Sequence, residues 1–298
     1  MHTKPSLHMS GIPNYLTSYR KHFARVAQRL PPRFDFRDHF NVKPDLAGIA
    51  RNTRFVAVDG RAGDLARLVE FPRLQGVYIQ HAGLRALGLI SSIRGLRELF
   101  IWELTADTTD SLASLRELRY LVVHDANRAR TLKPIASLTK LEALHLSELR
   151  QVTDLSSLRR LTRLRDLQLI GGLWSKWRVL SLSPLENLKN LEFLWMTSVR
   201  VRNGRLSPLA KLRKLRYLTM ENRFSLEECA ALAGALPNAR GNILGPFFSE
   251  TFPPCRHCHT DRIWTTGKPT KVLCPLCDRV RIEHRRATWN VLVAEAAA

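Results

Sequence analysis

The amino-acid sequence predicts an α/β solenoid: a right-handed horseshoe with a parallel concave sheet, followed by a small module built around cysteines. Two observations lead to this prediction. Seven segments, spaced 22 to 27 residues apart, each carry a leucine that is followed three and five residues later by another apolar residue. Four of the five cysteines form two CxxC pairs near the C-terminal end. Hydrophobic residues make up 45% of the 298 residues and charged residues 24%, which is a globular composition.

Each of the seven segments is expected to form one short strand. An isolated repeat would leave the apolar edge of its strand in water, whereas stacked repeats bury the inward leucines of neighbouring strands in one continuous core. Parallel strands about 4.8 Å apart allow this stacking. The segments begin at Leu74, Leu96, Leu118, Leu141, Leu164, Leu191 and Leu215.

This pattern resembles that of the leucine-rich repeat family, in its short, internalin-like variety. The resemblance covers about residues 55–236 and implies the horseshoe, with the strands on its concave side. Many family members carry an asparagine three positions after the last leucine of the motif. Here Leu104, Leu149 and Val199 stand at that position, which leaves open how the backbone of the turn is hydrogen-bonded.

The two ends of a solenoid need covering elements. Residues 15–30 carry apolar side chains at helical spacing with basic ones opposite, which predicts a basic amphipathic helix that caps the first repeat. Contact of this helix with a membrane surface or with nucleic acid is the alternative. RFVAVDG around Val56 predicts a capping strand, and SLEECAALAGALPN predicts a closing helix. Between the strands, leucine-rich stretches such as SLASLRELR predict short helical or 3₁₀ turns on the convex side.

The concave face of the predicted sheet is rich in aromatic residues. The third, fifth and seventh residues of each segment point away from the core, because side chains alternate along a strand. Seven of these 21 positions are aromatic, against 8% of the whole chain, and two more are histidine. Aromatic side chains are common interface anchors, so we expect this face to bind a partner. The expected contact residues are Tyr78, Phe100, Trp102, Tyr120, His124, His145, Phe193, Trp195 and Tyr217.

Two alternatives remain for this face: stacking between neighbouring strands, or cover by a terminal segment of the chain. The longest repeat favours the binding interpretation. Its insertion, GGLWSKWRVLSLS, is expected to place Trp174 and Trp177 in a loop beside the strands, and insertions in solenoids often lie at the binding face.

Basic residues flank the first leucine of the segments and predict a positive ridge along one edge of the solenoid. The net charge of +21 is spread along the chain, since residues 51–239 hold 30 of the 47 basic residues. Such a ridge attracts an acidic partner or a phosphate backbone, unless it is only solvated surface. The ridge residues are Arg94, Arg97, Arg116, Arg119, Arg163, Arg165, Lys214 and Arg216.

The two cysteine pairs, CRHC and CPLC, are separated by fifteen residues. Four thiolates at this spacing suit tetrahedral Zn²⁺, and the arrangement resembles a zinc ribbon over roughly residues 253–285, with RIWTT and RVRIEH as its expected strands. A nearby histidine in place of one cysteine is the alternative. Four thiolates leave no open position for water, so the zinc is expected to be structural rather than catalytic. The predicted ligands are Cys255, Cys258, Cys274 and Cys277.

The chain is thus expected to have four parts: a basic amphipathic helix and cap over 1–54, a solenoid of about seven repeats plus caps over 55–240, a linker over 241–252, and the zinc-ribbon-like module with its tail over 253–298. No G-x-S-x-G, H-E-x-x-H or phosphate-loop motif occurs in the sequence, so we do not expect an enzyme. No stretch approaches the roughly 18 apolar residues of a membrane span, and no secretory signal is apparent. Cysteines suited to a metal rather than to disulfides favour the cytoplasm.

The favoured interpretation is a non-enzymatic scaffold that recognises a protein partner through the aromatic concave face. An acidic protein would suit the positive charge of the chain. The C-terminal module would hold a structural zinc ion. The alternative is a nucleic-acid-binding protein. In that case the ridge and the ribbon would hold phosphates, and the aromatic side chains would stack on unpaired bases.

Overall fold

The computed structural model describes residues 42–172, 175–249 and 253–297. The expected helix over residues 15–30 and the side chain of Trp174 lie outside the described residues. Lys43–Ala298 form one compact unit, which holds both the repeats and the cysteines.

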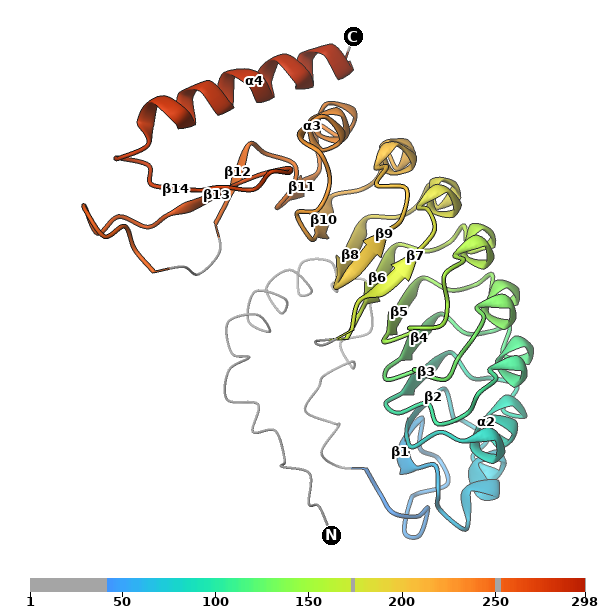
Figure 1. The fold of residues 1–298 in the computed structure, drawn as a ribbon. Helices are drawn as coiled ribbons and strands as arrows, with labels where there is room; N and C mark the ends of the chain where they lie inside the picture. The colour runs from blue at the N-terminus through green and yellow to red at the C-terminus, as the bar shows by residue number, and fades with distance from the viewer. Residues whose placement is uncertain (1–41, 173–174, 250–252, 298) are drawn as a thin grey trace. The chain divides into compact units, whose positions relative to one another are not determined.

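Nine parallel strands form one sheet, in which each repeat adds a strand beside that of the preceding repeat (Figure 1). Equivalent positions pair across the sheet, so that Leu99 lies opposite Leu121, and Leu121 opposite Leu144. The strands are β1 (Phe55–Asp59), β2 (Gly76–Gln80), β3 (Glu98–Ile101), β4 (Tyr120–Val123), β5 (Ala143–Ser147), β6 (Asp166–Ile170), β8 (Phe193–Thr197), β10 (Tyr217–Met220) and β11 (Arg240–Gly241). The predicted α/β solenoid with its parallel concave sheet is confirmed.

Short helices line the convex side of the repeats, as the leucine-rich stretches between the strands predicted (Figure 1). Leu112 and Ile135 on these helices, and Leu121 and Leu144 on the strands, are at most 2% exposed. Together with their equivalents they form one core that runs through all the repeats. The helices are η2 (Leu65–Glu70), α2 (Leu84–Ser91), η3 (Asp110–Ser114), η4 (Lys133–Ser137), η5 (Ser156–Arg160), η6 (Ser183–Asn187) and η7 (Ser207–Lys211).

The turns after the strands satisfy their backbone through the neighbouring repeat. The Ala82 N–H donates to the Glu103 carbonyl at 2.8 Å, and the Glu148 N–H donates to the Ile170 carbonyl at the same distance. Main-chain bonds therefore do what an asparagine side chain was expected to do, and the aliphatic residues in its place are buried. Four turn residues have positive φ angles of 52° to 60°: His81, Asp125, Glu148 and Ser198.

The longest repeat and the repeat after it add a second, two-stranded parallel sheet made of β7 (Trp177–Val179) and β9 (Val199–Val201). Trp177 is fully buried, and its indole N–H donates to the Val152 carbonyl at 2.5 Å. The expectation that Trp177 lies in a binding loop was therefore wrong. Alternation along β7 turns Trp177 and Val179 inward and leaves only Arg178 exposed.

The C-terminal end of the repeats is closed by the predicted helix, α3 (Leu226–Ala235). The Ser225 side chain caps it by accepting a hydrogen bond from the Glu228 N–H at 3.2 Å. Just past β11, the side-chain amide of Asn242 contacts the last residue of β10. Its Oδ1 accepts from the Met220 N–H at 3.1 Å, and its Nδ2 donates to the Met220 carbonyl at 2.7 Å.

The cysteine module contains a three-stranded antiparallel sheet of β12 (Phe247–Phe248), β13 (Ile263–Thr265) and β14 (Val272–Leu273). β13 is the strand expected from RIWTT. β12 falls within residues 241–252, which the sequence suggested as a linker, so part of that segment belongs to the sheet of the module.

A long helix, α4 (Arg279–Ala297), follows the second cysteine pair. RVRIEH forms its first turns, so the expectation of a strand there was wrong. Ile282 and Trp289 are seven residues apart and lie on one side of the helix, where they are 8% and 5% exposed. This spacing explains the helix, because it gives α4 an apolar face to pack along α3. No described helix is long and apolar enough to cross a membrane.

The module is hydrogen-bonded to the last repeat through Asn222. The Asn222 Nδ2 donates to the Thr265 carbonyl at 3.0 Å, and its Oδ1 accepts from the Gly267 N–H at 2.6 Å. The Lys268 N–H donates to the Phe224 carbonyl at 2.9 Å. Because α4 also packs along α3, the module covers the C-terminal end of the solenoid (Figure 1).

Candidate functional site

The four predicted metal ligands come together in the module, with all their Sγ atoms within 4.8 Å of one another. The Cys258 Sγ lies 3.3 Å from that of Cys274 and 3.6 Å from that of Cys277, and the Cys255 Sγ lies 3.8 Å from that of Cys277. None of them forms a disulfide. Sulfurs bound to one tetrahedral Zn²⁺ at about 2.3 Å would be about 3.8 Å apart, so this set of donors fits zinc.

Hydrogen bonds favour the thiolate, the form that binds a metal, at two of the four cysteines, whereas the neighbouring thiols raise the pKa of Cys277 to about 12. Hydrogen bonds from the N–H groups of His257 and Cys258 lower the pKa of Cys255. Hydrogen bonding by Thr260 lowers the pKa of Cys258 to about 6. Among the described residues, no histidine belongs to the cluster, so the alternative of a histidine ligand finds no support.

On the concave face, β2, β3 and the end of β4 hold a continuous group of rings. The ring centroids of Tyr78 and Phe100 are 4.8 Å apart, those of Phe100 and Trp102 are 6.4 Å apart, and those of Trp102 and His124 are 5.1 Å apart. A second group on β8 and β10 has centroids 6.2 and 6.3 Å apart and consists of Phe193, Trp195 and Tyr217. Seven of the nine expected contact residues therefore fall into two ring clusters.

The nine residues differ in their exposure. Burial raises the pKa of Tyr78 and that of Tyr120 to about 12. Four of the nine are buried, with 3% to 7% of their surface exposed: Phe100, Tyr120, Phe193 and Trp195. Five are half-buried: Tyr78, Trp102, His124, His145 and Tyr217. The accessible part of the face is thus narrower than the sequence pattern suggested.

Both histidines of the face contact a neighbouring strand. The His145 Nε2 lies 3.2 Å from the Asp166 Oδ2, and Asp166 is only 1% exposed. The His124 Nδ1 lies 2.9 Å from the Ser147 Oγ. These contacts fix the orientation of both imidazole rings within the sheet.

The predicted basic ridge is interleaved with acidic residues. Seven of its eight members are exposed, and Arg165 is half-buried. The Arg119 Nη1 donates to the Glu142 Oε1 at 2.9 Å, and the Arg165 Nε donates to the Glu192 Oε1 at 2.9 Å. Each pair joins adjacent repeats, so part of the charge of the ridge is balanced within the solenoid.

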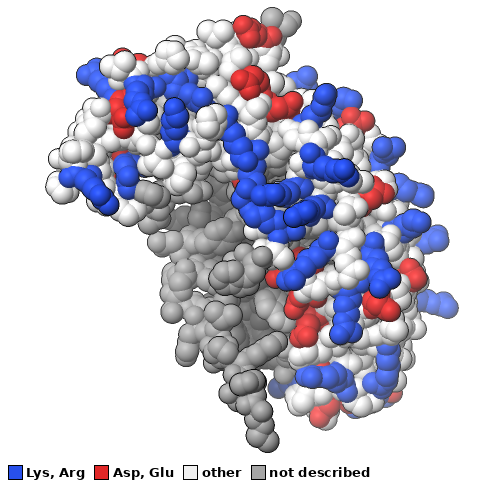
Figure 2. Space-filling view, in the orientation of Figure 1, with Lys and Arg blue, Asp and Glu red and all other residues white. Residues whose placement is uncertain are grey.

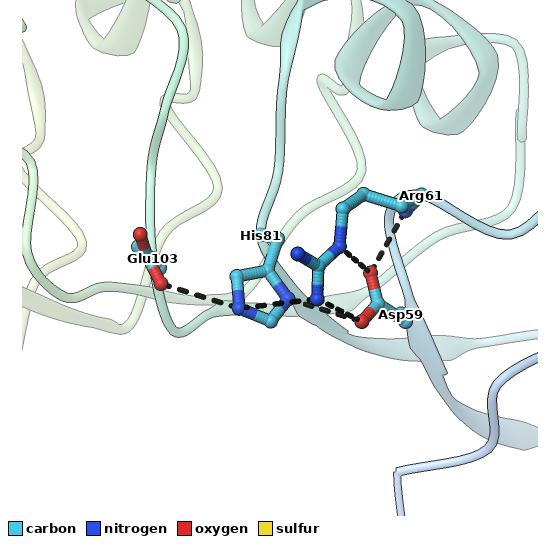
Figure 3. Close-up of polar contacts among 4 residues, drawn as sticks. All are labelled: Asp59, Arg61, His81 and Glu103. Atoms are coloured by element: carbon cyan, nitrogen blue, oxygen red, sulfur yellow. Dashed lines mark hydrogen bonds and ion pairs between the residues drawn. The ribbon is translucent and has the colours of Figure 1, made fainter. Parts of the chain in front are cut away.

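A polar cluster at the strand ends of the first repeats was not expected from the sequence (Figure 3). The Asp59 Oδ2 lies 2.9 Å from the Arg61 Nη2 and 3.0 Å from the His81 Nδ1, and the His81 Nε2 lies 3.4 Å from the Glu103 Oε2. Hydrogen bonding by Arg61 lowers the pKa of Asp59 to about 2. His81 and Glu103 both stand seven residues after the first leucine of their segments. Equivalent positions of adjacent repeats lie side by side, so this shared spacing was the signal in the sequence that the two side chains are neighbours.

A second positive surface lies over β7 and β9, where Figure 2 shows lysine and arginine side chains gathered. Arg178 and Arg200 are exposed and stand directly opposite each other in the register of the two strands. Neither has a carboxylate partner within the described ranges. Like charges in this position cost stability. In the sequence, the triplets WRV and VRV each place an arginine between two apolar residues. This alternation was the signal for two short strands with their arginines on the outer face.

No family model and no curated protein matches this chain. Solved structures similar to it include an internalin of Listeria monocytogenes, at 19% identity and a TM-score of 0.49 over 64% of this chain and 61% of the other. An internalin C2 of the same organism has 22% identity and a TM-score of 0.43 over 56% and 67% of the two chains. A leucine-rich-repeat protein of Leptospira interrogans has 16% identity and a TM-score of 0.45 over 59% and 50%. Identities this low say nothing about the partners of this chain. Its own repeats and nine-stranded parallel sheet make it a leucine-rich-repeat solenoid in fold.

Proposed function

We propose that this chain is a non-enzymatic binding scaffold that recognises a protein partner through its concave face, with a structural Zn²⁺ in the C-terminal module. The neighbouring rings of Tyr78, Phe100, Trp102 and His124 carry the proposal. All but Phe100 are half-buried rather than buried. These rings lie on the face of the sheet opposite the leucine core and are not part of that core.

The chemistry of these rings suits a protein partner. Aromatic side chains offer a large contact area with few rotatable bonds, so they lose little conformational entropy on binding. The parallel sheet holds them at fixed distances, because each strand pairs in register with the next. A preorganised surface of this kind spends less of its interaction energy on ordering itself.

Replacing Trp102 tests this proposal. After the partner is captured from the source cells, with and without nuclease treatment, Trp102→Ala should weaken its binding by about 2 kcal/mol, or roughly 30-fold. Trp264→Ala is the matched control, since Trp264 is equally half-buried but lies on β13, outside the concave face. Unchanged binding by Trp102→Ala, measured by calorimetry on a variant with a native circular dichroism spectrum, would contradict the proposal.

The sulfur cluster supports zinc as a structural ion. Four sulfurs complete a tetrahedral shell, so the ion would have no free position for a substrate or for a reactive water. Bound there, Zn²⁺ would hold the two CxxC turns together and would fix the start of α4, which begins two residues after Cys277. The free thiols also support our proposal that the protein resides in the reducing cytoplasm.

A nucleic-acid partner is the second candidate, and the arginines on β7 and β9 are the observation that favours it. Arg178 and Arg200 stand opposite each other and repel, and neither forms an ion pair with a carboxylate in the described part of the chain. A row of phosphates would supply the missing negative charge. The aromatic face and the ion pairs within the ridge nevertheless support the protein partner better.

A further inference from the structure

The C-terminal module contains a cavity of about 410 Å³ between α4 and the small sheet. Leu273 and Val280 contribute an apolar wall to it. Four basic or titratable side chains also line it, and no acidic residue does: Lys271, Arg281, His284 and Arg285. A volume of this size falls within the range of small-molecule sites.

The cations around the cavity are incompletely balanced. Arg281 contacts Asp278 at 3.1 Å, but this pair is largely in solvent, with 64% of the Arg281 side chain exposed. Lys271 forms no ion pair with any described residue. Charges of one sign that face a common hollow attract an anion, because the low-dielectric walls strengthen the field inside it.

Arg285 is the deepest of these cations. Its guanidinium donates from Nη2 to the Thr266 carbonyl, and its Nε is buried without an acceptor among the described residues. Burial lowers the pKa of Arg285, and the charge of Glu227 offsets this desolvation only in part. A partly buried charge without a paired anion is costly, and an anionic ligand would reduce that cost.

We propose that this cavity binds a small phosphorylated molecule, with its phosphate against Lys271, Arg281 and Arg285 and its organic part against Leu273 and Val280. Guanidinium groups hold phosphate oxygens with paired, charge-assisted hydrogen bonds, and an ammonium group adds a strong point charge. The apolar wall would contact a ring or a carbon chain. This site is separate from the concave face, so it goes beyond the proposed recognition of a protein partner.

The shape of the site favours a small molecule over a polynucleotide. The basic residues line one hollow bounded by α4 and the strands. A nucleic-acid backbone needs instead a track of cations that follows successive phosphates. The cavity therefore matches one terminal phosphate with an organic group attached.

The experiment uses the zinc-loaded full chain and isothermal titration calorimetry with adenosine 5′-monophosphate, inorganic phosphate and adenosine as probes. We expect the monophosphate to bind with a dissociation constant of about 1 mM or lower, inorganic phosphate to bind more weakly, and adenosine to bind at least about tenfold more weakly. Lys271→Ala should reduce the affinity for the monophosphate about tenfold, because it removes one charge-assisted contact. Lys271 is chosen because Arg285 also holds the Thr266 carbonyl, so replacing Arg285 would disturb the fold.

Arg279→Ala is the matched control. Arg279 lies on α4 close to the cavity-lining Arg281, but its side chain is 81% exposed, is paired with Glu283 and does not line the cavity. Equal losses in the control and in Lys271→Ala would indicate nonspecific attraction and overturn the proposal, as would the absence of any binding up to about 10 mM ligand. A short oligonucleotide without terminal phosphates that binds more tightly than the monophosphate, and that loses affinity in Lys271→Ala, would assign the cavity to nucleic acid and equally overturn it. The Trp102→Ala test of the concave face is unaffected by each of these outcomes.

Discussion

Trp195 on β8 and Trp102 beside β3 share the concave face but differ in their surroundings. Trp195 is 7% exposed, and its ring centroid lies 6.2 Å from that of Phe193. Trp102 is half-buried, and its ring centroid lies 5.1 Å from that of His124. A buried ring contributes more to folding than a partly exposed ring on the same sheet, because more of its surface is removed from water.

Trp195→Ala should therefore act on stability more than Trp102→Ala does. We expect Trp195→Ala to lower the free energy of unfolding by about 3 kcal/mol, since it removes a large buried side chain and leaves a cavity. Trp102→Ala should cost less than about half of that. Urea denaturation followed by circular dichroism measures both values. Equal losses of unfolding free energy in the two variants would show that the difference in exposure does not affect stability.

Asp59 should make a small contribution to stability that depends on pH. Hydrogen bonding by Arg61 lowers the pKa of Asp59 from 3.8 to about 2 in the folded chain. Because the folded pKa is the lower one, the stabilisation is present above about pH 4 and is lost as the pH falls towards about 2. Arg61 is 69% exposed, so solvent screening limits the effect to under about 1 kcal/mol.

Asp59→Asn checks this expectation. In denaturation curves recorded across that pH range, the variant should lose less stability on acidification than the wild type. Asp154→Asn serves as a comparison, because the pKa of Asp154 is also lowered, but by hydrogen bonds from Ser156, and its carboxylate lies outside the cluster at the strand ends. An identical pH profile for Asp59→Asn and the wild type would show that Arg61 and His81 do not stabilise the Asp59 carboxylate.

In the cysteine module, a short motif predicted the sulfur cluster, whereas α4 can be recognised only from a pattern over many residues. Two CxxC pairs are a local signal, and the four sulfurs do converge. RVRIEH alternates apolar and charged residues over a few positions, as a strand would. Only the wider spacing of Ile282 and Trp289 reveals the helix, because its apolar face becomes visible over 19 residues.

Loss of the metal should loosen this module. Cys274→Ser should reduce the zinc content, which we expect to be about one ion per chain by elemental analysis, and should destabilise the module by about 4 kcal/mol or more. Cys229→Ala is the control, since Cys229 is buried in α3 and lies outside the sulfur cluster. Hydrogen exchange along α4 reports the effect locally. Metal-free protein with an unchanged melting curve would exclude a structural ion.

On the scale of the whole molecule, the net charge is +21, and the basic residues differ in whether they are paired with a carboxylate. The ridge uses part of its charge in contacts between repeats, such as Arg119 with Glu142. The positive surface over β7 and β9 has a pair of arginines without such partners in the described structure. Salt should therefore affect the two surfaces differently.

The salt dependence of binding distinguishes the two candidate partners. A ridge that tracked a phosphate backbone would give a log–log slope beyond about −4, because each neutralised phosphate releases counterions. We expect only weak nucleic-acid binding that disappears near physiological salt, and an affinity for the protein partner that changes modestly. Submicromolar binding to DNA or RNA at about 150 mM salt, lost on charge reversal of Arg94, Arg116 and Arg163, would reverse this ranking.

Much of the fold could be predicted from the sequence because its signals repeat. The leucines recur in every repeat, so the strands, the convex turns and the core follow from one pattern. The candidate site was less accessible to prediction. Burial of Phe100 or Trp195 depends on what surrounds a concave position, and the strand pair of Arg178 with Arg200 depends on contact between two adjacent repeats. Neither the burial of these rings nor the pairing of the arginines recurs from repeat to repeat, so no repeated sequence pattern predicts them.

The amide of Asn242 has a consequence for how molecules of this protein behave in concentrated solution. The edge of a parallel sheet presents main-chain groups that can pair with a strand from another molecule and start aggregation. β11 pairs with only two residues of β10, and the Asn242 amide occupies both the N–H and the carbonyl of Met220 beyond them. A leucine at position 242 would leave both main-chain groups of Met220 without this partner. The Asn242 amide and the module that covers this end of the solenoid therefore both keep the last strands from pairing with another molecule.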